Sequence, residues 1–213
     1  MNLNDFLIPT GDVCRRPGPF DRIVLSSRVR LARNLQDTPF PGRANKSERQ
    51  NLLQTMKPVI ESLRSMKEGF SEELSKLKRL EKQILVERHL ISRELASKSQ
   101  GSAIVLSMDE TFCVMINEED HLRMQAILPG LQIKEAWKSM NKMDTMLESK
   151  LPIAFSSDFG YLTACPTNLG TGIRVSAMLH LPGLVMAEHM QQTITAVNKL
   201  GLAVRGLYGE GTE

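Results

Sequence analysis

The sequence is short of several features, and each shortage argues against a class of protein. Its 213 residues include three cysteines, Cys14, Cys113 and Cys165, without a CxxC pair, so we expect no disulfide or zinc framework. No apolar stretch approaches the ~18 residues of a membrane span, and Met1–Asn4 lacks a signal-peptide pattern. Lys and Arg number 27 against 24 Asp and Glu, with no basic block. We therefore expect a soluble, cytoplasmic protein without nucleic-acid or membrane partners.

Hydrophobic residues make up 41% of the chain and charged residues 24%, which is typical of a globular domain. A prior of ~150 residues per domain gives one to two domains. Prolines and glycines concentrate in the first 22 residues, which predicts an irregular lead-in there and a folded domain over 23–213.

Extended segments come in pairs separated by turns. Ile23–Leu31 predicts a strand, on which Arg28 and Arg30 point to the same face because they are two residues apart. The other segments expected to be extended are Ser102–Met108, Thr111–Ile116, Ile153–Phe155, Tyr161–Ala164, Ile173–Leu181 and Leu202–Leu207. Because strands arrive in hairpins rather than alternating with helices, we predict an α+β fold with a mainly antiparallel sheet flanked by helices.

Helical periodicity marks the remaining segments. Ser47 and Gln50 resemble a capping box, and a helical stripe then runs to Leu63, which Pro58 is expected to kink or divide. A second helix is predicted to start near Ser71. Further helical stripes are expected at Leu122–Leu128, Ile133–Leu147 and Leu184–Leu200.

Familiar nucleotide and metal motifs are missing. There is no GxxxxGK[ST] loop, and Asp158-Phe159-Gly160 stands without the other protein-kinase motifs, so a hairpin turn explains it better. The four histidines lack metal-ligand spacing, so we expect no metal site made of protein side chains.

The placement of arginines is unusual. Beside Arg28 and Arg30, Arg123 follows an acidic run, Arg174 closes CPTNLGTGIR, and Arg205 opens RGLYGE. Several converging guanidinium groups would clamp a polyphosphate, since each matches phosphate oxygens in a bidentate manner. The alternative is that each arginine pairs with a nearby carboxylate at the surface.

Four strings in this order, LSSRVRLARNL, INEEDHLR, CPTNLGTGIR and RGLYGEGTE, resemble the ATP:guanido phosphotransferases, or phosphagen kinases. The likeness runs from about Arg22 to the last residue and is strongest to the bacterial branch that acts on arginine in proteins. It implies a guanido kinase catalytic domain over 23–213 that transfers the γ-phosphoryl group of MgATP to a guanidinium nitrogen.

The resemblance also implies roles for individual residues. The nucleotide would be held by the phosphate-binding arginines, by His89 near adenine, and by the segments around them. These residues are Ser26, Ser27, Arg28, Val29, Arg30, His89, Arg123, Arg174, Val175, Ser176, Ala177, Met178, Arg205, Gly206, Leu207, Tyr208, Gly209 and Glu210.

On the acceptor side, Glu119 and Glu210 resemble the two carboxylates that grip the substrate guanidinium, and Cys165 resembles the cysteine beside it. Two carboxylates would orient the guanidinium and accept the proton lost as the N–P bond forms. Taken alone, Cys165 would rather be a small buried hydrophobe. Mg²⁺ would be held mainly by phosphates and water.

The length of the lead-in bears on the acceptor. Relatives acting on small free guanidines carry a helical domain before the strand at Ile23–Leu31, and 22 residues are too few to form it. We therefore expect arginine side chains of proteins to be the substrate, marked in this way for regulated degradation. The chain stops in a glycine-rich loop, so we expect it to be truncated before the C-terminal part of the domain, which puts the activity of these residues alone in question.

Two alternatives stay open: a kinase of small guanidines, and a nucleotide-binding module without turnover. For the protein-acting branch, the resemblance implies a zinc-binding activator (McsA) and the ClpC–ClpP protease as partners, with arginine-bearing proteins as substrates.

Overall fold

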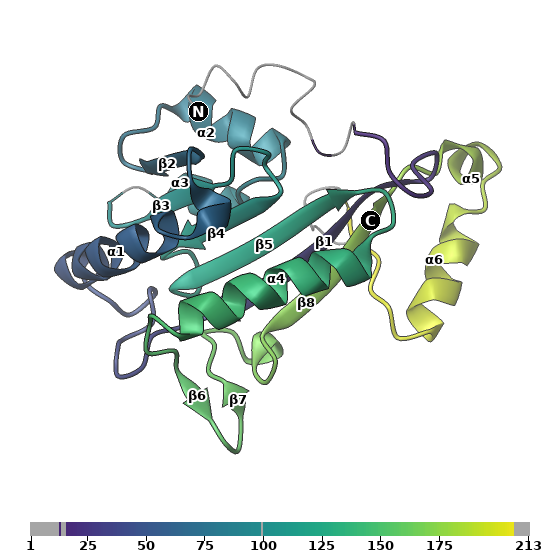
Figure 1. Ribbon diagram of the computed structural model, residues 1–213. Helices are drawn as coiled ribbons and strands as arrows, with labels where there is room; N and C mark the ends of the chain where they lie inside the picture. Colours follow the sequence, from purple (N-terminus) through teal and green to yellow (C-terminus); the bar gives the residue numbers. More distant parts are fainter. Residues whose placement is uncertain (1–12, 14–15, 99, 207–213) are drawn as a thin grey trace.

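A six-stranded antiparallel sheet forms the centre of the computed structural model, which describes residues 13, 16–98 and 100–206 (Figure 1). The strand order is β2-β3-β4-β5-β1-β8, and every neighbouring pair is antiparallel. The strands are β1 (Val24–Arg33), β2 (Phe70–Glu73), β3 (Ala103–Leu106), β4 (Phe112–Ile116), β5 (Leu122–Pro129) and β8 (Ile173–Leu179). A separate hairpin joins β6 (Phe155–Ser156) to β7 (Gly160–Tyr161). The predicted α+β class with a mainly antiparallel sheet is confirmed.

Helices cover the two faces of the sheet unequally. One face carries the two longest helices, α1 (Lys46–Glu61) and α4 (Ile133–Glu148). The short helices α2 (Arg79–Glu87) and α3 (Arg93–Ser97) cover the opposite face over β3 and β4. The remaining helical segments are η4 (Arg64–Met66), η5 (Pro166–Asn168), α5 (Pro182–Met186) and α6 (Met190–Lys199). Among the helices of the described chain, none combines the length and apolar character that crossing a bilayer requires.

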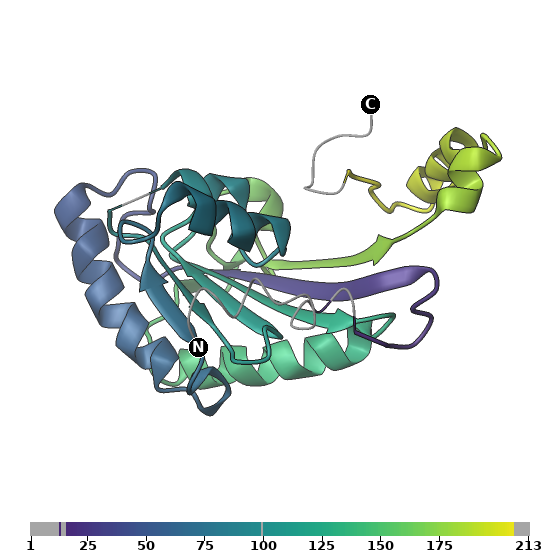
Figure 2. The same cartoon turned by 90° about the horizontal axis from the view of Figure 1, so that it is seen from above.

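Alternation along the strands sends apolar side chains into two cores. On β1, Val29 and Leu31 pack with α1 and α4, together with Met124 and Ala126 of β5. On the other face, Cys113 and Met115 of β4 pack under α2 and α3. Because α2 and α3 stop there, the same face of β5, β1 and β8 is left without a covering helix in the described chain (Figure 2).

The helix expected at Leu122–Leu128 is wrong, since this segment is strand β5. It lies between β4 and β1, with Met124 and Ala126 buried on one face and Gln125 and Ile127 buried on the other. Residues 122–126 do alternate apolar and polar, but Leu122 and Ala126 are also spaced as on one face of a helix. The apolar run 126–128 then interrupts the alternation, so the segment fits both patterns.

Other predicted boundaries change. The segment from Ser71 begins as β2, where pairing with β3 overrides the helical pattern, and helix α2 starts only at Arg79. Pro58 does not divide α1, which continues to Glu61, so the proline lies in the last turn of the helix. The capping box of α1 is formed by Asn45 and Glu48 rather than by Ser47 and Gln50.

The last predicted elements are also revised. Leu184–Leu200 is not one helix, because Glu188 has a φ of 57° between α5 and α6. Residues 202–206 form no strand, and Leu207 lies outside the described residues. The strands predicted at Ile23–Leu31 and Ile173–Leu181 and the hairpin of Ser102–Met108 with Thr111–Ile116 are confirmed as β1, β8 and β3–β4.

Candidate active site

The uncovered face of the sheet gathers four of the five arginines that the sequence singles out. In the register of β1 with β8, Arg30 lies opposite Arg174, and Arg28 lies opposite Ser176. Residues directly opposite in an antiparallel pair point to the same face. Arg123 of β5 lies opposite Ala32, two residues from Arg30, and therefore shares this face. We call Arg28, Arg30, Arg123 and Arg174 the arginine cluster.

The members of the arginine cluster interact electrostatically. Burial, together with the charges of Arg28, Arg123 and Arg174, lowers the pKa of Arg30 to about 9, against the opposing effect of Glu118. Its guanidinium therefore stays protonated at neutral pH, but at an energetic cost. Its buried Nε has no hydrogen-bond partner among the described residues. Such a group favours an anion that would supply both a charge and an acceptor.

The residues flanking the arginine cluster divide between the two faces of the sheet. Ser26, Ser176 and Met178 share the face of the cluster, and Arg28 Nε donates to Ser176 Oγ over 3.4 Å. The other predicted nucleotide-binding residues of these strands, Ser27, Val29, Val175 and Ala177, point to the opposite face. Their side chains therefore turn away from a ligand on the cluster, so only their backbone could reach it.

Ser27 has a structural task of its own. Its Oγ donates to the Gly130 carbonyl over 2.8 Å and accepts from the Gln132 amide over 2.8 Å. This pair of bonds ties β1 to the turn that leads from β5 into α4.

His89 lies beside the arginine cluster, at the edge of the layer formed by α2 and α3. Its carbonyl and that of Leu90 accept from Gln125 Nε2, at 2.9 and 3.0 Å, and Gln125 lies opposite Arg30 in the sheet. Next to His89, the buried Arg88 guanidinium forms an ion pair with Glu110, 2.7 Å from Nη2 to Oε1. These bonds fix the half-buried His89, which has a φ of 58°, close to the cluster.

Glu118 is the acidic partner within the cluster. It is fully buried and forms an ion pair with Arg123, while its carboxylate also accepts from Ser92 Oγ, the residue that caps α3. The Arg123 guanidinium and these hydrogen bonds hold the pKa of Glu118 below its usual value, despite the opposing effect of burial, which is the largest single influence. The pairing of Arg123 with a carboxylate, considered as the alternative to a phosphate clamp, is thus observed for this arginine alongside its place in the cluster.

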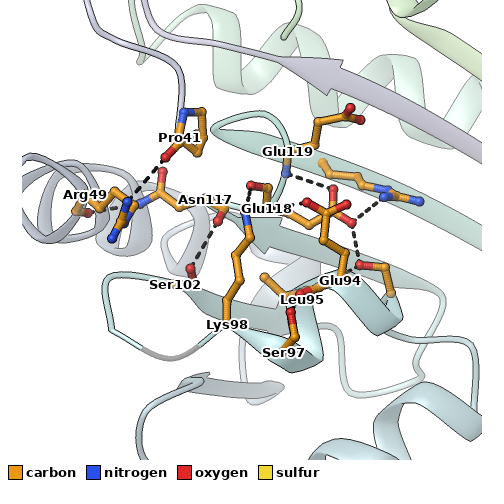
Figure 3. A network of polar contacts seen from close by, with 12 residues as sticks. Pro41, Arg49, Glu94, Leu95, Ser97, Lys98, Ser102, Asn117, Glu118 and Glu119 are labelled. Carbon is orange, nitrogen blue, oxygen red and sulfur yellow. Dashed lines mark hydrogen bonds and ion pairs between the residues drawn. The ribbon is translucent and has the colours of Figure 1, made fainter. Parts of the chain in front are cut away.

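Glu119 differs from Glu118 in the direction of its side chain and in the direction in which its pKa is moved. Its side chain points away from Glu118, and Glu94 of α3 lies nearby (Figure 3). Burial raises the pKa of Glu119, and the charges of Asp120, Glu118 and Glu94 raise it further, with Arg123 acting in the opposite sense. A carboxylate with a raised pKa is a better proton acceptor than an ordinary surface carboxylate. The acidic run therefore contains one carboxylate whose pKa is lowered, Glu118, and one whose pKa is raised, Glu119.

Asp120 connects the acidic run to the segment that carries Cys165. Its Oδ1 accepts from Asn34 Nδ2 and from the Ala164 amide, both at 2.7 Å. Asn34 also donates to the Leu162 carbonyl at 3.0 Å. Glu119 and Cys165, each adjacent in sequence to a member of this network, are thereby brought to one end of the sheet.

His121 completes this network. Asn34 Oδ1 accepts from the His121 amide at 2.8 Å, and His121 Nδ1 accepts from the Leu35 amide at 3.0 Å. Nε2 therefore carries the proton and donates to the Pro39 carbonyl at 3.0 Å. Because Nδ1 accepts a hydrogen bond, the ring is neutral and acts as a structural support, and burial lowers its pKa.

Cys165 is a free, partly exposed thiol at the start of η5. Its Sγ lies 3.0 Å from Thr167 Oγ1. The Cys165 thiol is thus accessible. Cys113, by contrast, is buried, and burial raises the pKa of its thiol. Cys165 therefore differs from the buried hydrophobe that a lone cysteine would suggest.

The remaining predicted site residues follow α6. Arg205 is exposed on the segment that leaves this helix, and Gly206 is half-buried there. The predicted site residues Leu207, Tyr208, Gly209 and Glu210 lie outside the described residues. Among the described residues, no group of three His, Cys, Asp or Glu side chains is arranged to hold a metal ion.

Sequence reasoning missed the residues that support the site. Asn34, Ser92 and Asp120 were not singled out, although Asp120 lies inside the acidic run. The run itself was a signal, because consecutive carboxylates before an arginine are costly unless each has a partner. Asn34 and Ser92 gave no such signal in the sequence, because their partners Asp120 and Glu118 lie far along the chain.

Comparison with known sequences agrees with this geometry. The profile of a family described as ATP:guanido phosphotransferase, C-terminal catalytic domain, matches residues 51–213. The protein-arginine kinase of Pelotomaculum thermopropionicum is 51% identical over 199 residues, and that of Brevibacillus brevis is 44% identical over 207 residues. These alignments cover 92% and 96% of this chain but 56% and 58% of the relatives, so the chain spans little more than half of their length.

Solved structures show the same fold. The duplicated taurocyamine kinase from Schistosoma mansoni, with bound transition state analog components, gives a TM-score of 0.80 at 29% identity, covering 100% of this chain and 30% of that chain. A lombricine kinase gives a TM-score of 0.74 at 26% identity, covering 95% of this chain and 60% of that chain.

Proposed function

Because the chain belongs to the ATP:guanido phosphotransferase family, we propose that it transfers the γ-phosphoryl group of ATP to the guanidinium of arginine residues in proteins. The observation that carries this proposal is the arginine cluster, in which Arg30 Nε has no partner within the described part of the chain, beside a carboxylate whose pKa is raised. The cluster suits the donor phosphates, and Glu119 suits the acceptor.

On the donor side, the cluster binds the triphosphate and stabilises the negative charge that spreads over the transferred group. Guanidinium groups fixed before the reaction need no reorganisation as this charge develops. Arg28, Arg30 and Arg174 come from paired strands, which hold their relative positions. His89 lies at the edge of the cluster, where the adenine would be held. Mg²⁺ is expected to arrive with ATP, and bound there it would neutralise phosphate charge.

On the acceptor side, Glu119 orients the guanidinium and takes the proton that leaves as the N–P bond forms. The proton acceptor must be ionised when the substrate binds, yet basic enough to be protonated in the transition state. Burial and the charges of Asp120, Glu118 and Glu94 raise the pKa of Glu119 and so make its carboxylate more basic. Cys165 lies on the segment tied to the acidic run and contacts the same substrate group. Glu210 is proposed as the second carboxylate.

The choice of acceptor follows from the relatives. Those with 44–51% identity are named protein-arginine kinase, whereas the solved structures of kinases named for small guanidines are 25–29% identical. We propose, on the same likeness, a cytoplasmic enzyme that works with a zinc-binding activator (McsA) and delivers marked proteins to ClpC–ClpP for regulated degradation.

The test offers the protein γ-labelled ATP and Mg²⁺ with an unfolded arginine-rich protein, or with free arginine, taurocyamine or lombricine. We expect phosphate on arginine side chains, located by peptide mass spectrometry under neutral conditions because the N–P bond is acid-labile. Glu119→Gln should abolish transfer while ATP binding persists. Phosphate on the free guanidines alone would overturn the choice of acceptor. ATP binding without transfer to any acceptor would leave a nucleotide-binding module and overturn the proposed activity.

A further inference from the structure

Arg33, the last residue of β1, occupies a junction that the proposed reaction does not itself use. Its side chain is 3% exposed, and its guanidinium grips Asp144 of α4 with Nε at 3.1 Å and Nη2 at 2.6 Å from the carboxylate oxygens. Its third nitrogen, Nη1, donates to the Ala32 carbonyl at 2.8 Å and to the Thr171 carbonyl at 3.0 Å. One guanidinium therefore joins β1, α4 and the turn before β8.

The same guanidinium also holds the β6–β7 hairpin. Arg33 Cζ lies 3.4 Å from the centroid of the Tyr161 ring, a cation–π contact. Tyr161 is anchored in turn, since its hydroxyl donates to Glu148 of α4 and its amide donates to the Gly170 carbonyl at 2.8 Å. Both ends of the segment between Tyr161 and Thr171 are thus attached to Arg33.

Close packing leaves this turn little freedom. Gly172 has a φ of 64°, and a Cβ built on it would lie 2.6 Å from Arg33 Nη1 and 2.7 Å from the Ala32 carbonyl oxygen. The Ala32 amide donates to the Gly172 carbonyl at 2.9 Å. Any displacement of the guanidinium would therefore move the turn as well.

The segment fixed in this way carries groups of both halves of the proposed site. Cys165, on the acceptor side, lies between Tyr161 and Thr171, and Arg174 of the arginine cluster follows three residues after Thr171. A buried ion pair often adds little stability compared with apolar residues of the same volume. Its clearest contribution here is geometric, since it sets where Cys165 stands relative to Arg174.

We propose that Arg33 is a positioning residue, which sets the place of Cys165 and of the acceptor guanidinium relative to the phosphate-binding cluster. This inference rests on the proposed function, because it takes Cys165 to lie in the acceptor site. Lysine cannot replace Arg33, since an ammonium group lacks the planar fork that reaches Asp144 and Thr171 together.

The experiment compares Arg33→Lys with Arg88→Lys. Arg88 is a matched control because it also forms a buried fork on a carboxylate, but beside His89. For each variant we would measure the alkylation rate of Cys165 by peptide mass spectrometry, which does not require turnover, together with the KM values for acceptor and ATP. Circular dichroism establishes that each variant is folded.

For Arg33→Lys we expect a severalfold change in the Cys165 alkylation rate, a higher KM for the acceptor, and a fall in kcat of about 10–100-fold, since a misplacement of about 1 Å has effects of that size. Arg88→Lys should leave the alkylation rate at the wild-type value. Tyr161→Leu removes the ring over the guanidinium and the hydroxyl bond to Glu148, but leaves the Arg33–Asp144 pair in place. It should change the alkylation rate in the same direction to a smaller extent, and it serves as the test if Arg33→Lys does not fold.

An unchanged alkylation rate in folded Arg33→Lys, or in Tyr161→Leu if the lysine variant does not fold, would overturn the positioning role. An equal change in Arg88→Lys would overturn it too, because any buried pair would then act alike. Failure of the proposed function is distinguishable from these outcomes, since it would appear as absent transfer by the wild-type protein.

Discussion

Arg30 shows how a single residue can favour binding at the expense of stability. Its guanidinium is largely buried among three other arginines, its pKa is lowered to about 9, and its Nε has no partner among the described residues. In the protein without nucleotide, these features oppose folding. They become favourable when phosphate oxygens occupy the cluster, which is the pattern expected of a binding residue rather than of a structural one.

Replacing Arg30 by methionine should therefore stabilise the nucleotide-free protein while weakening ATP binding. Removing the buried charge is expected to raise the free energy of unfolding by about 1 kcal/mol, or the melting temperature by about 2–4 °C for a chain of this size. The further increase in melting temperature that ATP gives the wild type should largely disappear. Thermal denaturation with and without ATP measures both effects.

Arg43→Met is the control, because Arg43 is exposed and lies before α1. It should leave both quantities close to wild type. A loss of stability in Arg30→Met together with an intact ATP response would contradict this account of the cluster.

Glu119 gives a prediction about pH. A proton acceptor works only when ionised, so kcat/KM should fall as the pH drops through the pKa of Glu119. Burial and the charges of Asp120, Glu118 and Glu94 raise that pKa, so the fall should begin at a higher pH than for an ordinary glutamate. Glu94→Gln removes one of these charges and should lower the pKa, moving the acid limb of the profile to lower pH.

The measurement is the pH profile of kcat/KM for wild type and Glu94→Gln. Glu72→Gln is the comparison. Glu72 lies on β2, the edge strand farthest from β8, and its replacement also removes one negative charge. Equal displacement of the acid limb in both variants would show that net charge, rather than the surroundings of Glu119, sets the profile.

At the scale of elements, strand parity is what the sequence revealed best. The two-residue spacing of Arg28 and Arg30 placed both on one face, and the structure confirms that arrangement. β5 was missed although residues 122–126 alternate apolar and polar, because the apolar run 126–128 interrupts the alternation and the segment also fits helical spacing. The segment from Ser71 was missed because pairing with β3 is a tertiary contact that the local pattern does not contain.

The candidate site shows the same limit. Motifs identified Glu119, Cys165 and the arginines, but what brings them together is a set of bonds between distant segments. Asn34 reaches Asp120 over 86 residues, and Ser92 reaches Glu118 over 26. No local pattern encodes such partners, since a buried asparagine or serine is recognised only once its surroundings are known.

Asn34 is the residue at which this joining of elements can be tested. It is fully buried, and its amide group donates to Asp120 and to the Leu162 carbonyl. Asn34→Asp would place a carboxylate within hydrogen-bond distance of Asp120 and would leave the Leu162 carbonyl without its donor. We expect a loss of about 3 kcal/mol in the free energy of unfolding, from repulsion and from the unpaired group.

Urea denaturation measures this loss, with Asn141→Asp on the exposed face of α4 as the matched control. The control should stay within about 0.5 kcal/mol of wild type. Lowering the pH should recover part of the loss in Asn34→Asp, because protonating either carboxylate removes the repulsion. Stability of the variant equal to that of the control would show that the Asn34–Asp120 bond does not hold the site together.

The whole molecule consists of parts that differ in how much apolar surface they bury. The strands β1, β3, β4 and β5 contribute to one or both hydrophobic cores, which α1, α4 and the layer of α2 and α3 complete. Beyond Gly172, by contrast, no described residue is buried. Helices α5 and α6 follow the end of β8 and lie apart from the rest of the molecule (Figure 2). Met186 and Leu200, at 84% and 78% exposed, illustrate how little that segment packs in the described chain.

Native-state hydrogen exchange should therefore separate two levels of stability in the 213-residue chain. Amides of α6 should exchange through local opening, because little burial opposes it, whereas amides of β1 and β5 should exchange only when the whole domain unfolds. Low concentrations of denaturant should accelerate exchange in the strands but hardly alter it in α6. ATP should slow exchange further in β1 and β5, which carry the arginine cluster. Protection of α6 equal to that of β5 would contradict this division and would mean that the helix is held by contacts beyond those of the described chain.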